Sequence, residues 1–466
     1  MAITNDHVLA KEARLRGDYS LALEIIEDLL DENPNDEAAL FILGGIFIDT
    51  QRRGLAYTIM SRCAALAPDR PEVWNNFART QNDNEEGWAI TEGMLNKALE
   101  LKPDMLAPYQ NLASLEIQRC NPEKALEYIE KCYEINPDDQ IAKSCSGFAN
   151  FMLGNWETGF KDYHAMMGHR SRPKNLITDP EGNELTEWDG TEGKTIIING
   201  EQGIGDELVY AQMLPDLAKI SKYVIFDCME RLKGLMTRSL PENVIVTGSR
   251  WDEGIELPKH VQPDCNMSIA GIGQYLRKSD DDFDGEPYLT PSDEMRTAVR
   301  GLLDSLGSKP KIGIAWTGGT KRSRCHFRQK TLEYLTPILR NKDVDFISLQ
   351  YKDFSEEIEK YEKDRGIKIH SFPWITENKD YDMTAALVSE LDLVIGVPTS
   401  VIQLAGALGT ESWVLVPETT GWLYYRDKYV WSKFVKPFHK WTSKTVEKAL
   451  KMRLENGNSR LHIVNN

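Results

Sequence analysis

The first third of the chain repeats a pattern of apolar residues at helical spacing, and each repeat closes on a proline. The prolines follow one another at intervals of 34, 35 and 34 residues. Apolar positions three and four residues apart predict amphipathic helices, and small residues at fixed places let the helices of a hairpin approach closely. The prolines are Pro34, Pro68, Pro103 and Pro137, and the small residues are Ala10, Gly44, Ala78 and Ala113 on a first helix and Ala22, Ala56 and Ala125 on a second.

This arrangement resembles the tetratricopeptide repeat, in which helical hairpins bury their apolar faces by stacking on one another. It predicts four repeats and a fifth, partial one from about Ile141, which together make a domain at residues 1–165. A stacked array leaves a concave surface, so we expect a protein or an extended peptide to bind there. A spacer, or a dimerisation surface that makes a homo-oligomer, is the alternative. Amide side chains that suit a peptide backbone are Asn75, Asn76, Gln110 and Asn111.

From about residue 185, short β-branched runs alternate with helical segments, which predicts βαβ units and parallel sheets. The run divides near 291–310, a polar helical stretch that ends in Gly307, Ser308 and Pro310. We therefore predict two doubly wound half-domains, at 166–295 and 296–466, with their chemistry in the loops that follow the strands. Strands are expected at 195–199, 223–227, 244–247, 311–316, 345–349, 393–396 and 413–416, and helices at 207–220, 332–339, 384–390 and 401–408.

The composition limits which cellular compartment and which binding partners we expect. The chain of 466 residues has 55 Lys and Arg against 72 Asp and Glu, a net charge of −17, so a nucleic-acid-binding surface is not expected. No apolar run approaches the ~20 residues that span a bilayer, and the N-terminus lacks the apolar core of a signal peptide. The seven cysteines are scattered without a Cys-x-x-Cys pair, which argues against a disulfide framework and a zinc site. We expect a cytoplasmic protein.

The loop after the first strand, residues 199–207, carries glycines and carboxylates and runs directly into a helix. Gly203 and Gly205 allow close backbone approach, and the helix start offers N–H groups to an anion or a polar substrate. Asp206 is either the N-cap of that helix or a general base at the edge of the sheet. Glu201 and Gln202 belong to the same candidate loop.

Two loops of the second half are candidates for binding phosphate. Thr399 and Ser400 follow an apolar strand and open a helix, as a diphosphate-binding turn requires, although a plain capped helix has the same pattern. The loop 316–324 is basic in an otherwise acidic chain, so it either holds phosphate charge or is simply solvated. Its candidate residues, with the arginine beyond it, are Thr317, Gly318, Lys321, Arg322 and Arg328.

Three other patterns are set aside. Residues 190–195 look like a phosphate-binding P-loop, but Trp188 stands at the first glycine position and a strand follows where a helix is needed. The acidic run 280–282 is interpreted as a solvated loop, so no divalent-metal site is expected. Cys325 and His326 have no third partner for nucleophilic catalysis.

Taken together, several stretches resemble bacterial and phage proteins that fuse tetratricopeptide repeats to a glycosyltransferase of the GT-B fold. These proteins are related to lipopolysaccharide heptosyltransferases and more distantly to O-linked N-acetylglucosamine transferases. The resemblance covers nearly the whole chain and implies that the α/β region is a GT-B fold of two Rossmann-like half-domains. The matching stretches are 153–160 (LGNWETGF), 200–206 (GEQGIGD), 287–289 (PYL), 313–318 (GIAWTG), 348–350 (SLQ), 399–401 (TSV) and 404–409 (LAGALG).

The resemblance implies that a sugar moves from a nucleotide-diphosphate donor to an acceptor hydroxyl, with inversion, and without a metal or other cofactor. Asp206 matches the aspartate of the Gly-x-Gly-Asp loop that is the proposed base in heptosyltransferases. The repeats would then deliver a protein or peptide acceptor. The residues that we assign to donor binding are Thr317, Gly318, Lys321, Arg322, Arg328, Gln350, Asp382, Thr384, Thr399, Ser400 and Gln403.

The chain also departs from the family. Heptosyltransferases usually have Asp before the turn threonine and His four residues after it, where this chain has Pro398 and Gln403. The donor sugar and the nucleotide base are therefore not carried over. The departures favour an alternative function, a non-catalytic adaptor with a degenerate GT-B domain. A small-molecule or lipid-linked acceptor is a third hypothesis, in which the repeats serve oligomerisation.

Overall fold

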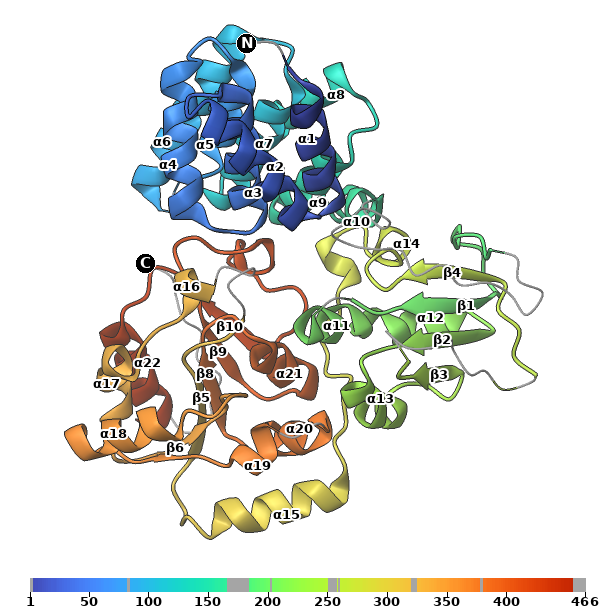
Figure 1. The fold of residues 1–466 in the computed structure, drawn as a ribbon. Coiled ribbons are helices and arrows are strands. Elements are labelled where there is room, and N and C mark those ends of the chain that lie inside the picture. Colours follow the sequence, from blue (N-terminus) through green and yellow to red (C-terminus); the bar gives the residue numbers. More distant parts are fainter. Residues whose placement is uncertain are drawn as a thin grey trace. The chain divides into compact units, whose positions relative to one another are not determined.

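The computed structural model describes residues 3–81, 84–165, 184–201, 203–249, 258, 260–319, 325–377 and 380–455. The chain forms two compact units, Met1–Ala149 and Asn150–Asn466 (Figure 1). The boundary falls within helix α9 (Gln140–Leu153) and not at the expected 165/166. The reason is that helix α10 (Trp156–Ala165), which we expected to close the repeat array, packs on helix α14 (Gly273–Leu276) of the α/β region.

The first unit is a series of helical hairpins, one for each predicted repeat. The small residues that align between repeats are buried, as their spacing predicted. At Gly44 the approach is close, because a Cβ there would lie 2.3 Å from Met60 Cε on the paired helix. The helices are α1 (Asn5–Arg16), α2 (Tyr19–Glu32), α3 (Glu37–Asp49), α4 (Arg53–Leu66), α5 (Pro71–Ala78), α6 (Glu85–Leu101), α7 (Leu106–Gln118) and α8 (Pro122–Ile135).

Most of the amide side chains that we expected to contact a bound peptide form hydrogen bonds within the array instead. Asn111 Nδ2 donates to Asn75 Oδ1 at 2.8 Å, so these two residues join helices α7 and α5. Gln110 Nε2 donates to Asp139 Oδ2 at 2.8 Å. Their first role is therefore to fix neighbouring repeats, because a buried amide must find its hydrogen bonds within the fold.

A four-stranded parallel sheet forms the first half of the α/β region, with the order β3-β2-β1-β4. The order reverses next to β1, so the loop after β1 lies at the switch point where such sheets bind ligands. The helix expected at 207–220 is interrupted, because Pro215 has no N–H to continue it and stands at the start of a new helix. The elements are β1 (Thr195–Asn199), α11 (Ile204–Tyr210), η1 (Ala211–Met213), α12 (Leu214–Ile220), β2 (Tyr223–Asp227), η2 (Glu230–Leu232), α13 (Lys233–Ser239), β3 (Val244–Thr247), β4 (Cys265–Ser268), α14 and η3 (Asp280–Asp282).

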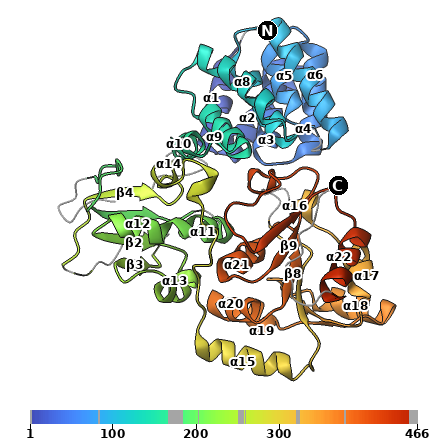
Figure 2. The same cartoon turned by 180° about the vertical axis from the view of Figure 1, so that it is seen from behind.

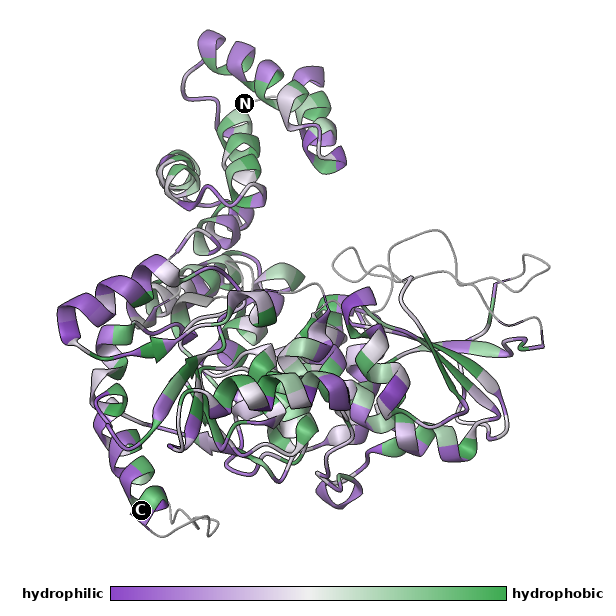
Figure 3. Cartoon of the chain, turned by 90° about the horizontal axis from the view of Figure 1, so that it is seen from below, coloured by the Kyte–Doolittle hydropathy of each residue, from purple (hydrophilic) through white to green (hydrophobic). Residues whose placement is uncertain are grey.

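A six-stranded parallel sheet forms the second half, with the order β10-β9-β8-β5-β6-β7. Counted from its own first strand, this is the 3-2-1-4-5-6 order of Rossmann sheets, with the switch point between β5 and β8. The strands of both sheets are coloured mainly as hydrophobic in Figure 3, as expected for parallel strands covered on both faces. The elements are α15 (Asp293–Asp304), β5 (Lys311–Ala315), α16 (Cys325–Arg328), α17 (Leu332–Leu339), β6 (Asp345–Ser348), α18 (Ser355–Arg365), β7 (Ile369–His370), α19 (Pro373–Thr376), α20 (Tyr381–Ser389), β8 (Leu393–Gly396), α21 (Ser400–Leu408), β9 (Ser412–Leu415), η4 (Trp422–Tyr424), β10 (Val435–Phe438) and α22 (Ser443–Glu455).

Strands β4, β7 and β10 were not predicted from the sequence. The residues of β4 are Cys-Asn-Met-Ser, without a β-branched or aromatic side chain, and the strand is held by its ladder to β1 and by Asn266 Nδ2, which donates to Leu185 O at 2.8 Å. Strands β7 and β10 are the two edges of the second sheet, where a proline such as Pro437 is tolerated. These strands form because a neighbouring strand pairs with them.

The segment that joins the two sheets is anchored in both of them. The backbone N–H groups of Tyr288 and Leu289 donate to Ala407 O of α21 at 2.9 and 3.0 Å. The Tyr288 hydroxyl donates to Leu208 O of α11 at 2.6 Å. Helices α11 and α21 lie side by side, and both views of the chain show this (Figures 1 and 2).

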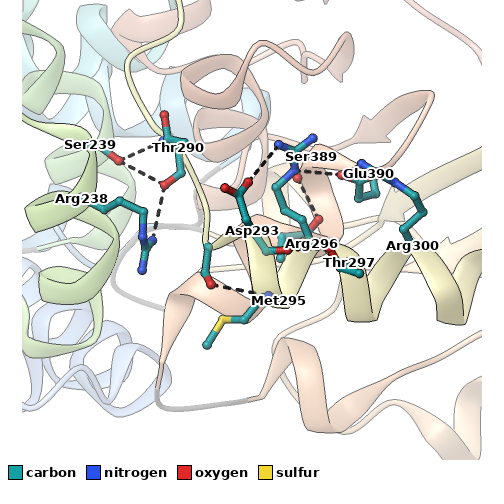
Figure 4. A network of polar contacts seen from close by, with 12 residues as sticks. Arg238, Ser239, Thr290, Asp293, Met295, Arg296, Thr297, Arg300, Ser389 and Glu390 are labelled. Atoms are coloured by element: carbon teal, nitrogen blue, oxygen red, sulfur yellow. Dashed lines mark hydrogen bonds and ion pairs between the residues drawn. The ribbon is translucent and has the colours of Figure 1, made fainter.

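Helix α15 belongs with the second sheet, although most of its first turn precedes residue 296, where we expected the second half-domain to begin. Arg296 and Arg300 both bind the carboxylate of Glu390, which follows α20 (Figure 4). On the other side of the same segment, Arg238 and Ser239 of α13 bind Thr290. The two halves therefore meet at the segment just before Asp293.

Aromatic rings connect the start of the second unit to the α/β region. The rings of Trp422 and Tyr210 stack with centroids 6.3 Å apart and planes 8° apart, and the Trp422 centroid lies 4.6 Å from that of Phe151. Tyr210 ends helix α11 and Trp422 opens η4, so the cluster fixes both elements. Its rings are Phe151, Trp156, Phe160, Tyr163, Tyr210, Phe283, Trp422 and Trp431.

The interpretation of residues 280–282 as a solvated loop is wrong for Asp280. Its carboxylate accepts from Trp156 Nε1 at 2.8 Å and forms two hydrogen bonds of 2.6 Å with Arg426. The Arg426 guanidinium, with the help of Trp156, holds the pKa of the Asp280 carboxyl below its ordinary value. Asp280 therefore ties α10 to the second half of the α/β region.

Replacing Asp280 with Asn is expected to destabilise the second unit by about 1–3 kcal/mol near neutral pH, because a bidentate ion pair is lost. A lowered pKa in the folded state means that the carboxylate contributes fully above its unfolded pKa and loses its contribution as the pH falls through the lowered value. The difference in Tm between wild type and Asp280→Asn should therefore stay constant down to about pH 5 and shrink as the pH falls further. Thermal melts on both sides of this pH measure it. A difference that stays constant with pH would contradict the assigned ion pair.

Candidate functional site

A cavity of about 550 Å³ opens between the two halves of the α/β region. This volume suits a small organic ligand. The walls come from loops at the carboxyl ends of β1, β2, β5, β6, β8 and β9, as the switch-point rule predicts. The lining residues are Gly203, Ile204, Gly205, Asp206, Arg231, Ala315, Thr317, Gly318, Gly319, Arg328, Leu349, Gln350, Tyr351, Thr376, Tyr381, Thr384, Pro398, Thr399, Ser400, Val401, Gln403, Gly421, Trp422, Leu423 and Tyr424.

The first wall is the turn between β1 and α11. Its N-cap is Gly203 and not Asp206, which instead lies in the first turn of the helix with an exposed side chain on the cavity. The turn lies close to the other half at Gly205, where a Cβ would be in van der Waals contact, 3.5 Å from Ser400 Cα and 3.9 Å from Ser400 N. The Asp206 carboxylate therefore faces a cavity whose opposite wall includes the start of α21.

The opposite wall is built where the loops after β5 and β8 meet. A Cβ at Gly318 would lie 2.5 Å from Thr399 Cγ2, so only glycine lets the β5 loop pass the turn at this distance. Thr399 is the N-cap of α21, but its side chain makes no capping hydrogen bond. The N-terminus of a nine-residue helix thus borders the cavity and offers it the positive end of the helix dipole.

Two buried polar atoms on this wall have no hydrogen-bond partner among the described residues. Gln350 is only 4% exposed, and its side-chain Nε2 has no acceptor in that part of the chain. The Thr399 Oγ1 is also buried and also has no hydrogen-bond partner among the described residues. Burial of an unsatisfied donor or hydroxyl costs about 1–3 kcal/mol, so these two groups on the cavity wall are available to a polar ligand.

Arginines line both walls. Arg328 comes from the second half, where its Nε donates to Gly318 O at 3.3 Å. Arg231 comes from the first half, on η2 directly after β2. Among the described residues of the lining, Asp206 is the only carboxylate. The cavity therefore has a positive balance of charge in a chain whose net charge is −17.

Most of the candidate residues from the sequence meet in this cavity. Gly203, Gly205 and Asp206 do so from the first half, and the second half supplies Thr317, Gly318, Arg328, Gln350, Thr384, Thr399, Ser400 and Gln403. Glu201 is buried outside the lining. Gln202, Lys321 and Arg322 lie outside the described residues.

Asp382 does not belong to the cavity. It is 2% exposed, its Oδ2 lies 2.7 Å from an Arg238 guanidinium nitrogen, and its Oδ1 accepts from Ser292 N at 3.1 Å. A buried carboxylate needs such partners, and here they come from α13 and from the start of α15. The assignment of Asp382 to donor binding is corrected to a structural contact between the two halves.

Two cavity residues already have hydrogen-bond partners for their polar ends. The Thr384 hydroxyl donates to Ile375 O at 3.0 Å. Gln403 is 7% exposed; its Nε2 donates to the Tyr424 hydroxyl, and its Oε1 accepts from the Tyr429 hydroxyl. Burial raises the pKa of both tyrosines, so their hydroxyls stay protonated. Gln403 therefore shapes the cavity wall by holding Tyr424.

Several lining residues were missed in the sequence. Arg231 follows β2, and Trp422 with Tyr424 follows β9, so the rule that places ligands after strands pointed to these segments. Nothing in their local pattern distinguished them from ordinary surface and core residues. Tyr381 was missed because it begins a helix whose start follows no strand directly.

Within the described part of the chain, no group of three or more His, Cys, Asp and Glu side chains is placed to hold a metal ion. In the same residues, every helix is too short or too polar to cross a membrane.

Comparisons with known proteins match one stretch of the helical array to a known repeat family. Residues 106–139 match the model of the tetratricopeptide repeat. Protein FlbA of Caulobacter vibrioides is 27% identical over 481 residues, which covers 93% of this chain and 80% of that protein. Among solved structures, MamA is 19% identical, and the match covers 36% of this chain and 94% of the MamA chain with a TM-score of 0.30. A thermophilic TPR protein of Thermus thermophilus is 16% identical, and that match covers 36% of this chain and 91% of the other chain with a TM-score of 0.33. The chain therefore combines a series of helical hairpins, one of which matches the tetratricopeptide repeat, with a parallel-sheet α/β region in its C-terminal part.

Proposed function

We propose that the α/β region is a glycosyltransferase of the GT-B type, which moves a sugar from a nucleotide-diphosphate donor to an acceptor hydroxyl. The observation that carries the proposal is the close approach of the Asp206 turn to the start of α21, with Gly205 against Ser400. A carboxylate and an anion-binding helix start then face one ligand-sized cavity.

The chemistry follows from these positions. Asp206 takes the proton of the acceptor hydroxyl, whose oxygen forms a bond to the anomeric carbon of the sugar. The bond between that carbon and the diphosphate oxygen breaks, and its electron pair stays on the diphosphate. The Ser400 helix start and Arg328 stabilise the charge that develops there. Attack from the face opposite the leaving group inverts the anomeric carbon.

The unpaired groups of the second wall fit the rest of the donor. Gln350 and Thr399 offer a buried amide donor and a buried hydroxyl, which suit the polar edges of a nucleotide or sugar. Arg328 offers a planar guanidinium, which binds phosphate oxygens with two parallel hydrogen bonds. A cofactor has no step in this scheme, and we propose that transfer needs no metal ion.

The acceptor is proposed to be a protein that the repeat array binds. Stacked helical hairpins present a large surface that their own core does not use. Mass spectrometry of proteins co-expressed with the chain checks this, because a glycosylated protein should gain the mass of one or more sugars. Transfer only to a small molecule or lipid would contradict the protein acceptor.

Titration calorimetry of the full chain with a panel of nucleoside diphosphates in the presence of EDTA tests the donor site. At least one should bind with a Kd in the micromolar range, about −8 kcal/mol. Transfer should continue in EDTA. Activity that EDTA abolishes and manganese restores would contradict the metal-independent mechanism.

A non-catalytic adaptor is the second candidate function. The observation that favours it is the engagement of Gln403 by Tyr424 and Tyr429, which leaves this position little freedom to contact a donor. An adaptor predicts no nucleoside-diphosphate binding, so the same calorimetry decides between the two.

A further inference from the structure

Arg231 lies at the junction of the two halves. It stands on η2, which follows β2 of the first sheet, and lines the cavity. Its guanidinium carbon lies 4.9 Å from the centroid of the Tyr381 ring, which belongs to the second half. A cation over an aromatic face is attracted to it, and the ring fixes the plane of the guanidinium.

Tyr381 connects this arginine to the start of α21. The Tyr381 ring is buried, and its hydroxyl donates to Ser400 Oγ at 3.4 Å. Ser400 is the first residue of α21, and it also faces Gly205 of the first half. Arg231 is therefore held near the N-terminus of a helix by a side chain that is itself bonded to that N-terminus.

Positive groups converge at this position. The N-terminus of a helix carries about half a positive charge, and Arg231 brings a full positive charge close to it. Arg328 adds a second positive charge to the cavity lining. The buried Nε2 of Gln350, which has no acceptor among the described residues, lines the same cavity. A cavity with these donors fits a ligand that carries more than one negative charge.

We infer that Arg231 is a diphosphate-binding residue which the first half contributes to the donor site. The inference rests on the proposed function. As the bond between the anomeric carbon and the diphosphate oxygen breaks, the diphosphate gains a negative charge. N–H groups of Arg231 and Arg328 donate to its oxygens from opposite walls. The donor site is therefore complete only when the two halves face each other across the cavity.

A specific consequence concerns the number of phosphates. The second phosphate of a nucleoside diphosphate adds charge at the place where Arg231 and the helix start converge. Arg231 should therefore matter much more for a nucleoside diphosphate than for the corresponding monophosphate, and the difference should weaken as salt screens the charges.

The experiment is calorimetry on the full chain with the best-binding nucleoside diphosphate and its monophosphate. Arg231→Ala should weaken diphosphate binding by about 10- to 100-fold, since a hydrogen bond to a charged group contributes about 1.5–3 kcal/mol. Monophosphate binding should change by less than about threefold. Arg231→Lys should restore part of the loss, because it keeps the charge and loses the planar fork.

Lys233→Ala is the matched control, because Lys233 is an exposed cation two residues away and outside the cavity lining. It should leave both affinities unchanged. Arg231→Ala and Arg231→Lys variants that both keep the wild-type preference for the diphosphate would overturn the inference and leave the proposed function standing. A wild-type chain that binds no nucleoside diphosphate would instead contradict the proposed function itself.

Discussion

Asp206→Asn should lower the rate of sugar transfer by about 10²- to 10⁴-fold, the usual contribution of a positioned general base. Asn has the shape of Asp but cannot take the proton of the acceptor hydroxyl. The groups proposed to hold the diphosphate are the start of α21, Arg231 and Arg328, and not Asp206, so the affinity for the diphosphate should stay within about threefold of wild type. Transfer rates with a radiolabelled donor, together with calorimetry, measure the two effects separately.

Glu230→Gln is the control for this prediction. Glu230 is an exposed carboxylate on η2 that does not line the cavity, so the substitution removes the same charge without touching the site. It should leave transfer unchanged. An Asp206→Asn protein with full activity would show that another group deprotonates the acceptor, while loss of diphosphate binding would place Asp206 in the donor site.

Gly200→Ala is expected to destabilise the α/β region by about 1–3 kcal/mol, because a methyl group must be forced into a filled space. A Cβ at position 200 would lie 2.8 Å from the backbone oxygen of Asp227 and 2.2 Å from Glu207 Oε1. The backbone oxygen belongs to the neighbouring strand β2 and cannot move aside, since it accepts from Gly200 N at 3.0 Å. The strain should also displace the turn that carries Asp206 and reduce transfer.

Gly234→Ala provides the matched comparison. Gly234 lies in helix α13, and a methyl group added there would meet no atom within 4 Å, so alanine should stabilise the helix by up to about 1 kcal/mol. Urea denaturation followed by tryptophan fluorescence gives both changes. Equal denaturation midpoints for the two variants would contradict the crowding described at Gly200.

The candidate site shows how far local sequence rules reach. They placed Asp206 and Thr399 correctly in the cavity, because both follow a buried strand and stand at or near the start of a helix. The family resemblance placed Asp382 in the site, and Arg231 was missed, although both are charged residues near the ends of regular elements. The difference between the two depends on contacts with distant segments, Arg238 for Asp382 and Tyr381 for Arg231.

The sequence by itself determined the elements that are stabilised locally. The helical hairpins and the apolar strands carry their own periodicity, so they are recognised without knowing their partners. The tertiary structure alone decided the edge strands β7 and β10, the boundary inside α9 and the residues that share the cavity. The physical reason is that edge pairing, helix docking and the burial of charge depend on groups far apart in the chain, whose positions only the folded structure specifies.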